Sequence, residues 1–237
     1  MTKPHLRETI LEYLKSDGAF LQLVSEVEKT HDIILFGGVV RDYIVGMSLD
    51  PRDFDMVLYP RGLQSDNILT LLRYVFPEDN ISKNQFGGYK VQDSHMKADI
   101  WLLCDTWAFK EGLLEATLNN LTKSVFLNID AYAYHFTNMY FIEQCDENNL
   151  PYEIDYVLEK NPKLLLNIIR ALEFSDKYDI ELSTRLRKLA IESLSGRGCI
   201  QRAILEQQLH YGEIILSEEK IAETIIAMNM KDKEGRP

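Results

Sequence analysis

The stretch GGVVRDYIVGMSLDPRDFDMV, residues 37–57, decides the expected fold. The apolar run at 33–36 directly before it predicts a buried strand. Glycines straight after a strand let the backbone turn sharply, and the N–H groups that open the next helix can face a phosphate. Gly37 and Gly38 therefore form a candidate phosphate cradle.

Two acidic residues follow on the next predicted strand, residues 53–59. Asp53 and Asp55 are two positions apart, so their carboxylates point to the same face of an extended chain. Two carboxylates on one face suit a divalent cation that takes oxygen ligands and bridges phosphates. A phosphate cradle followed by a magnesium site indicates chemistry on a nucleoside triphosphate.

This stretch resembles the core of the DNA polymerase beta-type nucleotidyltransferases, above all the head domain of bacterial CCA-adding tRNA nucleotidyltransferases and poly(A) polymerases. The residues that match the signature in order and spacing are Gly37, Gly38, Val40, Arg41, Asp42, Gly46, Asp53 and Asp55. The resemblance implies an α+β fold, with a mixed sheet and flanking helices followed by a helical C-terminal extension. It implies a catalytic domain over 1–148, including N-terminal helices in 1–30, and a helical neck-like domain over 149–237.

The family's core needs a third carboxylate on a neighbouring strand. A hairpin is predicted in residues 86–105, and Asp99 is the acidic residue inside its apolar strand at 98–103. A buried strand does not carry a lone Asp without a cost in free energy, which favours a functional role over an edge-strand Asp facing water. By resemblance, Asp53, Asp55 and Asp99 hold two Mg²⁺ ions, or Mn²⁺ in their place.

Three further residues are candidate nucleotide contacts. Arg41 can contact a phosphate or pair with Asp42. Residues 124–134 resemble the family block that holds the sugar and triphosphate, which makes Asp130 a candidate ribose contact, although core packing explains the same matches. Arg170, in the predicted neck, can reach the nucleotide or pair with an acid.

The neck segment departs from the family where the incoming base is selected. Asn161 and Leu164 stand where CCA-adding enzymes have the Asp and Arg that act as a template for the base. These two side chains cannot offer the same paired donors and acceptors. The resemblance thus supports nucleotidyl transfer and argues against ordered CCA addition.

Composition limits the partners. The net charge is −11, from 37 acidic and 26 basic residues, which argues against a large basic surface for nucleic acid. If RNA is the acceptor, Arg187 and Arg197 in the basic C-terminal helices are candidate contacts, with a solvated helix face as the alternative. No apolar run approaches the ~20 residues of a membrane span, and the N-terminus has no signal-peptide pattern. A cytoplasmic protein is expected.

The sequence therefore predicts a nucleotidyltransferase that moves a nucleoside monophosphate from an NTP to a hydroxyl acceptor. AMP from ATP is the favoured donor, and an RNA or tRNA 3′ end is the favoured acceptor. Nucleotidylation of a protein or small molecule, and an inactive nucleotide-binding module, stay open as alternatives. So do the oligomeric state and a partner chain.

Three local expectations accompany this prediction. Helix 65–76 should be capped by Ser65 or Asp66, and residues 231–237 should form a frayed tail. The three cysteines, Cys104, Cys145 and Cys199, should be buried or partly buried thiols rather than disulfides or metal ligands.

Overall fold

The computed structural model describes residues 5–47, 51, 53–62, 67–142 and 149–234. Its contacts divide the chain into two compact units, one of residues 1–125 and 130–150, and one of residues 126–129 and 151–237. The first unit holds the sheet and the second is helical. None of the helices in the described segments is long and apolar enough to cross a membrane.

Within the described residues, seven strands form one mixed sheet in the order β3-β4-β5-β2-β1-β6-β7. The neighbours β2 and β5 run parallel, and the other neighbouring pairs are antiparallel. The strands are β1 (His31–Phe36), β2 (Phe54–Pro60), β3 (Ile81–Lys83), β4 (Tyr89–Gln92), β5 (Lys97–Leu102), β6 (Ala133–His135) and β7 (Tyr140–Phe141). The expected α+β class is confirmed.

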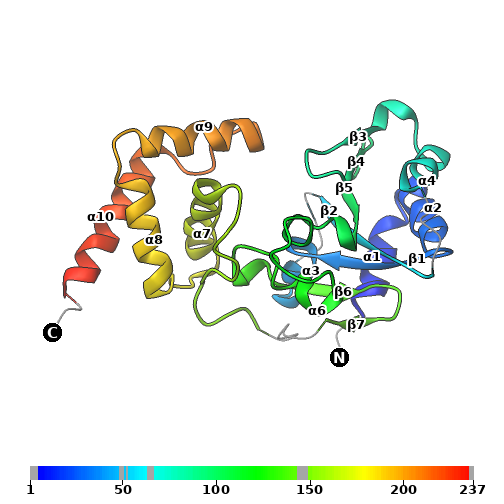
Figure 1. Cartoon of the computed structure of the whole chain (residues 1–237), viewed down its shortest axis with the longest axis horizontal. Helices are drawn as coiled ribbons and strands as arrows, with labels where there is room; N and C mark the ends of the chain where they lie inside the picture. Colours follow the sequence, from blue (N-terminus) through cyan, green and yellow to red (C-terminus); the bar gives the residue numbers. More distant parts are fainter. Residues whose placement is uncertain (1–4, 48–50, 52, 63–66, 143–148, 235–237) are drawn as a thin grey trace. The chain divides into compact units, whose positions relative to one another are not determined.

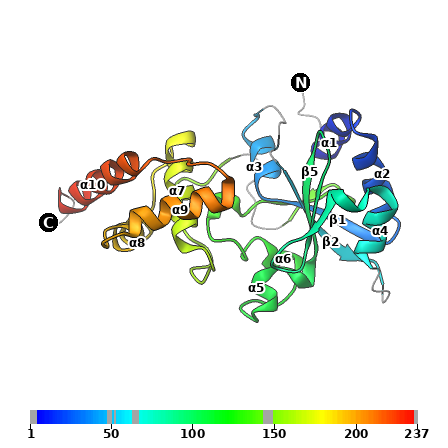
Figure 2. The ribbon, with the colours of Figure 1, turned by 90° about the horizontal axis from the view of Figure 1, so that it is seen from above.

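One face of the sheet is packed against helices, as Figure 1 shows. The helices α1 (Leu6–Leu14), α2 (Gly18–Val27), α3 (Gly38–Ile44) and α4 (Ile68–Val75) contribute apolar side chains to one core cluster. Alternate strand residues such as Leu35, Met56 and Ile100 join that cluster. Period-two alternation places the intervening residues on the other face. Figure 2 shows α2 and α4 side by side on their side of the sheet.

The segment after β5 forms short turns of helix that lead back to the sheet. These are the 3₁₀ turn Leu103–Asp105, α5 (Trp107–Lys110), α6 (Leu118–Leu121) and the 3₁₀ turn Asn128–Asp130. Another 3₁₀ turn, Glu78–Asn80, lies between α4 and β3. The indole Nε1–H of Trp101 donates to Thr106 Oγ1 at 3.1 Å, which ties the end of β5 to α5.

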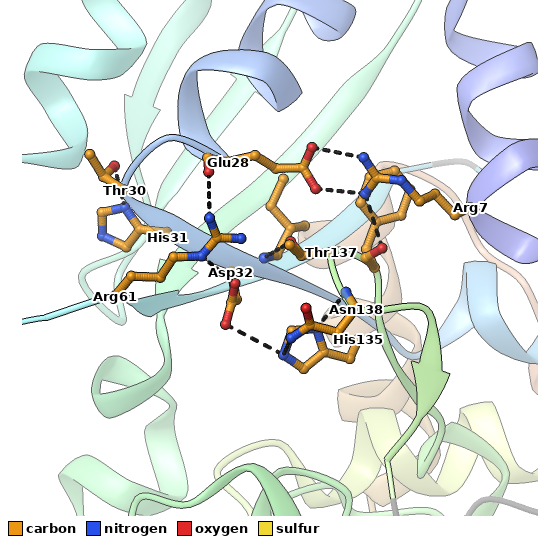
Figure 3. Close-up of polar contacts among 11 residues, drawn as sticks. Arg7, Glu28, Thr30, His31, Asp32, Arg61, His135, Thr137 and Asn138 are labelled. Carbon is orange, nitrogen blue, oxygen red and sulfur yellow. Dashed lines mark hydrogen bonds and ion pairs between the residues drawn. The ribbon is translucent and has the colours of Figure 1, made fainter.

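A polar network holds together the end of the sheet where β1 begins (Figure 3). Arg7 of α1 donates to both carboxylate oxygens of Glu28, at 2.6 and 2.8 Å. Arg61, just after β2, donates to Asp32 Oδ1 at 2.5 Å and to the Glu28 carbonyl at 2.9 Å. Buried His135 lies 3.6 Å from Asp32 Oδ2, and burial lowers the pKa of its imidazole. Strand β1 pairs His31 with Pro60 at this end and Phe36 with Asp55 at its other end. The network therefore lies at the end of β1 that is away from Asp55.

The second unit contains α7 (Leu164–Tyr178), α8 (Thr184–Leu194), α9 (Cys199–Tyr211) and α10 (Glu218–Glu234). Buried Gln207 of α9 fixes the turn before α10, because its Oε1 accepts the N–H groups of Ile215 and Leu216. The expected helical C-terminal extension is confirmed.

Three local expectations need correction. Helix α4 begins at Ile68 and its cap is Asn67, whose Oδ1 accepts the N–H of Leu69; Ser65 and Asp66 lie outside the described residues. Helix α10 continues to Glu234, so residues 231–234 are helical rather than frayed, since the run KDKE consists mostly of good helix formers. Cys104 is exposed, Cys199 is partly buried as expected, and Cys145 lies outside the described residues.

Candidate functional site

Two of the three predicted acidic residues lie on one face of two parallel strands. Asp55 of β2 and Asp99 of β5 are direct register partners, so their side chains leave the sheet on the same face. Asp53 precedes β2 by one residue and is also partly exposed. Neighbouring strands are about 4.8 Å apart, a spacing that lets two carboxylates reach one ion.

The Gly37–Gly38 turn lies against the same carboxylates. Gly37 follows β1 with φ 67° and ψ −127°, a conformation that glycine adopts and other residues avoid. A Cβ at Gly37 would lie 3.5 Å from Asp55 Oδ2, in ordinary van der Waals contact. The requirement for glycine is therefore one of backbone angle rather than of space.

The backbone donors of the turn differ in their availability to a phosphate. The N–H of Gly37 donates to the Tyr132 carbonyl at 2.8 Å, and the Gly37 carbonyl accepts from Val40 and Arg41 as α3 begins. Gly37 thus shapes the turn, and the N–H groups of Gly38 and Val39 are the ones that open the helix toward a ligand.

Arg41 is buried beneath this turn and bonded to two carboxylates. Its Nε donates to Asp42 and its Nη1 donates to Asp130, both at 2.9 Å. The side chains of Arg41 and Asp130 are only 7% and 10% exposed. A buried, hydrogen-bonded guanidinium of this kind fixes the backbone around it. The structure thus includes the Arg41–Asp42 pair that was the alternative to a phosphate contact, and adds Asp130 to it.

Lys90 is a neighbour of the candidate site that the sequence did not single out. It lies on β4 directly across from Asp99, and its Nζ is 3.5 Å from Asp99 Oδ2. The Lys90 side chain is 51% exposed and the Asp99 side chain 20%. The alternation of side chains along the predicted hairpin shows which strand residues share a face. It does not show that Lys90 pairs with Asp99, because that depends on the register of the two strands.

The residues suit a magnesium ion in chemistry, but they are not yet gathered around one. Carboxylate oxygens beside a phosphate-facing turn are the ligands that Mg²⁺ takes in phosphoryl-transfer sites. Among the described residues, however, no three or more His, Cys, Asp or Glu side chains lie close enough together to hold a metal ion. A metal ion bound by Asp99 would lie close to the Lys90 ammonium group.

The other predicted residues belong to the second unit. The Arg170 guanidinium lies 5.4 Å from the centroid of the Phe174 ring. Arg187 is bonded locally, with Nη1 3.3 Å from the Leu182 carbonyl and 3.8 Å from Glu181 Oε2. Arg197, in the loop between α8 and α9, is exposed.

Asn161, which stands where the resembled family has its template Asp, makes local hydrogen bonds. Asn161 Oδ1 accepts from Asn167 Nδ2 at 2.6 Å and from the Lys163 N–H at 3.4 Å, just before α7 starts at Leu164. The Asn161 carbonyl is thus used to organise the start of the helix.

No protein-family model matches the sequence, and no curated protein matches it. Solved structures do match its fold. A CCA-adding enzyme in complex with ATP superposes with a TM-score of 0.60 and 16% identity, over 97% of this chain and 56% of that one. The Thermotoga maritima CCA-adding enzyme complexed with tRNA gives a TM-score of 0.60 and 16% identity, over 97% and 55%.

A tRNA-processing enzyme with CTP gives a TM-score of 0.55 and 19% identity, over 85% of this chain and 54% of that one. The chain thus spans about half the length of these structures. At this identity the likeness concerns the fold. The chain has the nucleotidyltransferase fold of the CCA-adding enzymes, as residues 37–57 predict.

Proposed function

We propose that this protein is a metal-dependent nucleotidyltransferase, which moves a nucleoside monophosphate from an NTP to a hydroxyl group and releases pyrophosphate. The observation that carries the proposal is the register pairing of Asp55 with Asp99 on one face of the sheet, next to the Gly37 turn. The fold shared with CCA-adding enzymes supports the same reaction class.

Asp53, Asp55 and Asp99 would hold the metal, as two Mg²⁺ ions or Mn²⁺ in their place. Bound there, the metal would stabilise negative charge on the attacking and leaving oxygens of an in-line displacement. The N–H groups of Gly38 and Val39 would bind the triphosphate. Asp99 would also accept a hydrogen bond from the attacking hydroxyl and so orient it.

Arg41 and Asp130 act in this proposal through the turn rather than on the nucleotide. Their buried ion pair, together with Asp42, holds the start of α3 where Gly38 must present its N–H group. Because the position of a phosphate ligand depends on those backbone atoms, loss of the pair would loosen NTP binding indirectly.

The acceptor that the fold supports first is the 3′ end of an RNA, with tRNA foremost, because one structural neighbour is a CCA-adding enzyme with tRNA. We propose a cytoplasmic location for the protein, as expected from the sequence. ATP is the favoured donor, and one neighbour is a complex with ATP. The hydrogen bond from Asn167 to Asn161 supports a loose choice of base rather than ordered addition. Exposed Arg197 is a better candidate than Arg187 for an RNA contact.

A small molecule or a protein is the second candidate acceptor. The net charge of −11 favours it, because binding of a tRNA backbone usually relies on clustered Lys and Arg side chains. An inactive nucleotide-binding module is less favoured, since the sequence keeps Asp53, Asp55 and Asp99, and Asp55 and Asp99 are paired on neighbouring strands.

The test is to incubate the purified protein with each α-labelled NTP, Mg²⁺ and either total RNA or a small-molecule extract of cells. Label is then assigned to RNA by ribonuclease, to protein by protease, and to small molecules by chromatography. We expect label transfer that disappears in Asp55→Ala. Absence of transfer from every NTP to every acceptor would contradict the proposal.

A further inference from the structure

A row of polar side chains crosses the carboxylate face of the sheet. Strand register pairs Ser82 of β3 with Lys90 of β4, Lys90 with Asp99 of β5, and Asp99 with Asp55 of β2. Directly paired residues leave a sheet on the same face, so these four side chains lie in line. The Gly37 turn is at the Asp55 end of the row, because β1 is the next strand.

A polar hollow of about 380 Å³ lies at the other end of this row. Its lining consists of Asp79, Asn80, Ser82, Lys90, Gln92, Asp93 and Ser94. Gln92 is two residues beyond Lys90 on the same strand, so it shares the face of Lys90 and Asp99. The hollow therefore adjoins the third carboxylate, with Lys90 between them.

The lining chemistry selects a class of ligand. It has two carboxylates, which accept hydrogen bonds, two amides and two hydroxyls, which both accept and donate them, and one ammonium group, which donates them. The charges sum to −1, from two Asp and one Lys, which disfavours a polyphosphate. The described residues that line the hollow include no aromatic side chain, so they offer no platform on which a base could stack. Hydrogen-bonding groups without aromatic or cationic clusters suit an uncharged ring that carries several hydroxyls.

We propose that this hollow binds the acceptor, and that the part of the acceptor it holds is a sugar ring with neighbouring hydroxyls. The inference rests on the proposed nucleotidyl transfer and names the acceptor side of that site. The ring can come from the 3′ end of an RNA or from a free glycoside, since both present the same hydroxyl chemistry.

The row of residues gives the geometry that the reaction needs. The triphosphate lies on the Gly37 side of Asp55, and the sugar lies on the Lys90 side of Asp99. The sugar hydroxyl, which attacks, and the pyrophosphate, which leaves, thus lie on opposite sides of the carboxylates. An in-line displacement requires this opposite placement. A sugar hydroxyl oxygen forms a bond to the α-phosphorus while the bond from that phosphorus to the bridging oxygen breaks. Pyrophosphate leaves with the bond's electrons, and the hydroxyl proton passes to water.

Binding can be tested without any transfer, so failure of the reaction and failure of this inference are distinguishable. The side-chain amides of Asn80 and Gln92 give NMR signals in the ¹⁵N-labelled full chain. The probes are a short RNA with a free 3′ ribose, the same RNA after periodate oxidation of its terminal diol, and methyl ribofuranoside. A shift of both amide signals by intact but not oxidised RNA identifies an RNA 3′ end. A shift by the free glycoside identifies a small-molecule acceptor.

The kinetic arm fills the hollow. Gln92→Trp places a large ring at an exposed position of β4, and Thr70→Trp makes the same change at an exposed position of α4, on the helix-packed face. We expect Gln92→Trp to raise the KM for the acceptor at least about tenfold, a common scale for losing a substrate contact, while NTP binding stays unchanged. Thr70→Trp should match the wild type. No amide shift with any probe at millimolar concentration, or an unchanged acceptor KM in Gln92→Trp, would overturn the proposal.

Discussion

Replacing Lys90 by methionine should tighten the binding of Mn²⁺ to the protein in the absence of nucleotide. The Lys90 ammonium lies 3.5 Å from Asp99 Oδ2, so a metal that uses Asp99 must displace this cation and then lie close to it. Methionine keeps most of the length of the side chain and removes its charge. The metal ion would then bind Asp99 without competition from the Lys90 ammonium group.

The size of the effect follows from the distance and the exposure. Two unit charges at 3.5 Å interact by about 1.2 kcal/mol in bulk water and by about 5 kcal/mol at an effective dielectric constant of 20. The Lys90 side chain is half exposed, so solvent screening brings the value to the range of exposed ion pairs, at most about 1 kcal/mol. That energy corresponds to about a fivefold decrease in the Mn²⁺ dissociation constant.

The assay is a titration of the apo protein with Mn²⁺, with free ion counted by electron paramagnetic resonance. Lys90→Arg, which keeps the charge, should bind Mn²⁺ like the wild type. Lys83→Met is the matched control, because Lys83 is next to Ser82 on β3 and so faces the other side of the sheet. Equal or weaker binding by Lys90→Met, or an equal gain in Lys83→Met, would refute the reasoning.

Three other outcomes can be measured directly. Asp55→Ala should lower the rate of nucleotide transfer by at least about 10²-fold without lowering the melting temperature, and unchanged turnover would remove Asp55 from the metal site. Asp130→Asn should lower the free energy of unfolding in urea by about 3 kcal/mol, because the buried Arg41 then loses one of its carboxylate partners. A loss below about 1 kcal/mol would show that the Arg41–Asp130 ion pair does not stabilise the fold. With tRNA lacking its end and all four NTPs, sequencing should show no ordered addition of two C and one A, since Asn161 has lost the template chemistry; faithful CCA would contradict this.

The turn and acidic strand were predictable because each step depends on local sequence. Two glycines after an apolar run, a short amphipathic helix and an Asp pair at spacing two define the strand, turn and face without knowledge of the rest of the fold. The assignment of Asp99 to a neighbouring strand came from the order of the resembled family. The structure then gives its register with Asp55.

The contacts that support the site were not predictable because they join distant positions. Arg41 and Asp130 are 89 residues apart, and the pairing of β6 with β1, together with the hydrogen bond from the Gly37 N–H to the Tyr132 carbonyl, brings their segments together. The contact of Lys90 with Asp99 depends on the register of the hairpin, and a slip of one residue would place Lys90 on the other face. Asn67 caps α4 although Ser65 and Asp66 are equally good capping residues, so residue type alone could not decide among them.

Variants of Asp17 can separate two contributions to stability, the capping of α2 by its side chain and the burial of its negative charge. Its side chain is buried, and Oδ1 accepts the N–H groups of Ala19 and Phe20 at 3.1 Å, which caps α2. Its other oxygen, Oδ2, is buried without a hydrogen-bond partner among the described residues. Burial raises the pKa of Asp17 and the neighbouring Asp93 carboxyl raises it further, against the lowering effect of the capped N–H groups.

An acid whose pKa is raised by folding stabilises the protein below the unfolded value, about 3.9, and that contribution is lost as the pH rises through the folded value. Asp17→Asn keeps an oxygen for the cap and places an uncharged NH₂ in the position of Oδ2, so it should be more stable than the wild type at pH 7. Asp17→Ala, the control, loses the cap and should be about 1 kcal/mol less stable than Asp17→Asn at every pH. Urea unfolding between pH 4 and pH 8 measures all three proteins. The advantage of Asp17→Asn over the wild type should grow with pH and vanish near pH 4, whereas an advantage independent of pH, or a loss at pH 7, would show that the buried charge of Asp17 is not what limits stability.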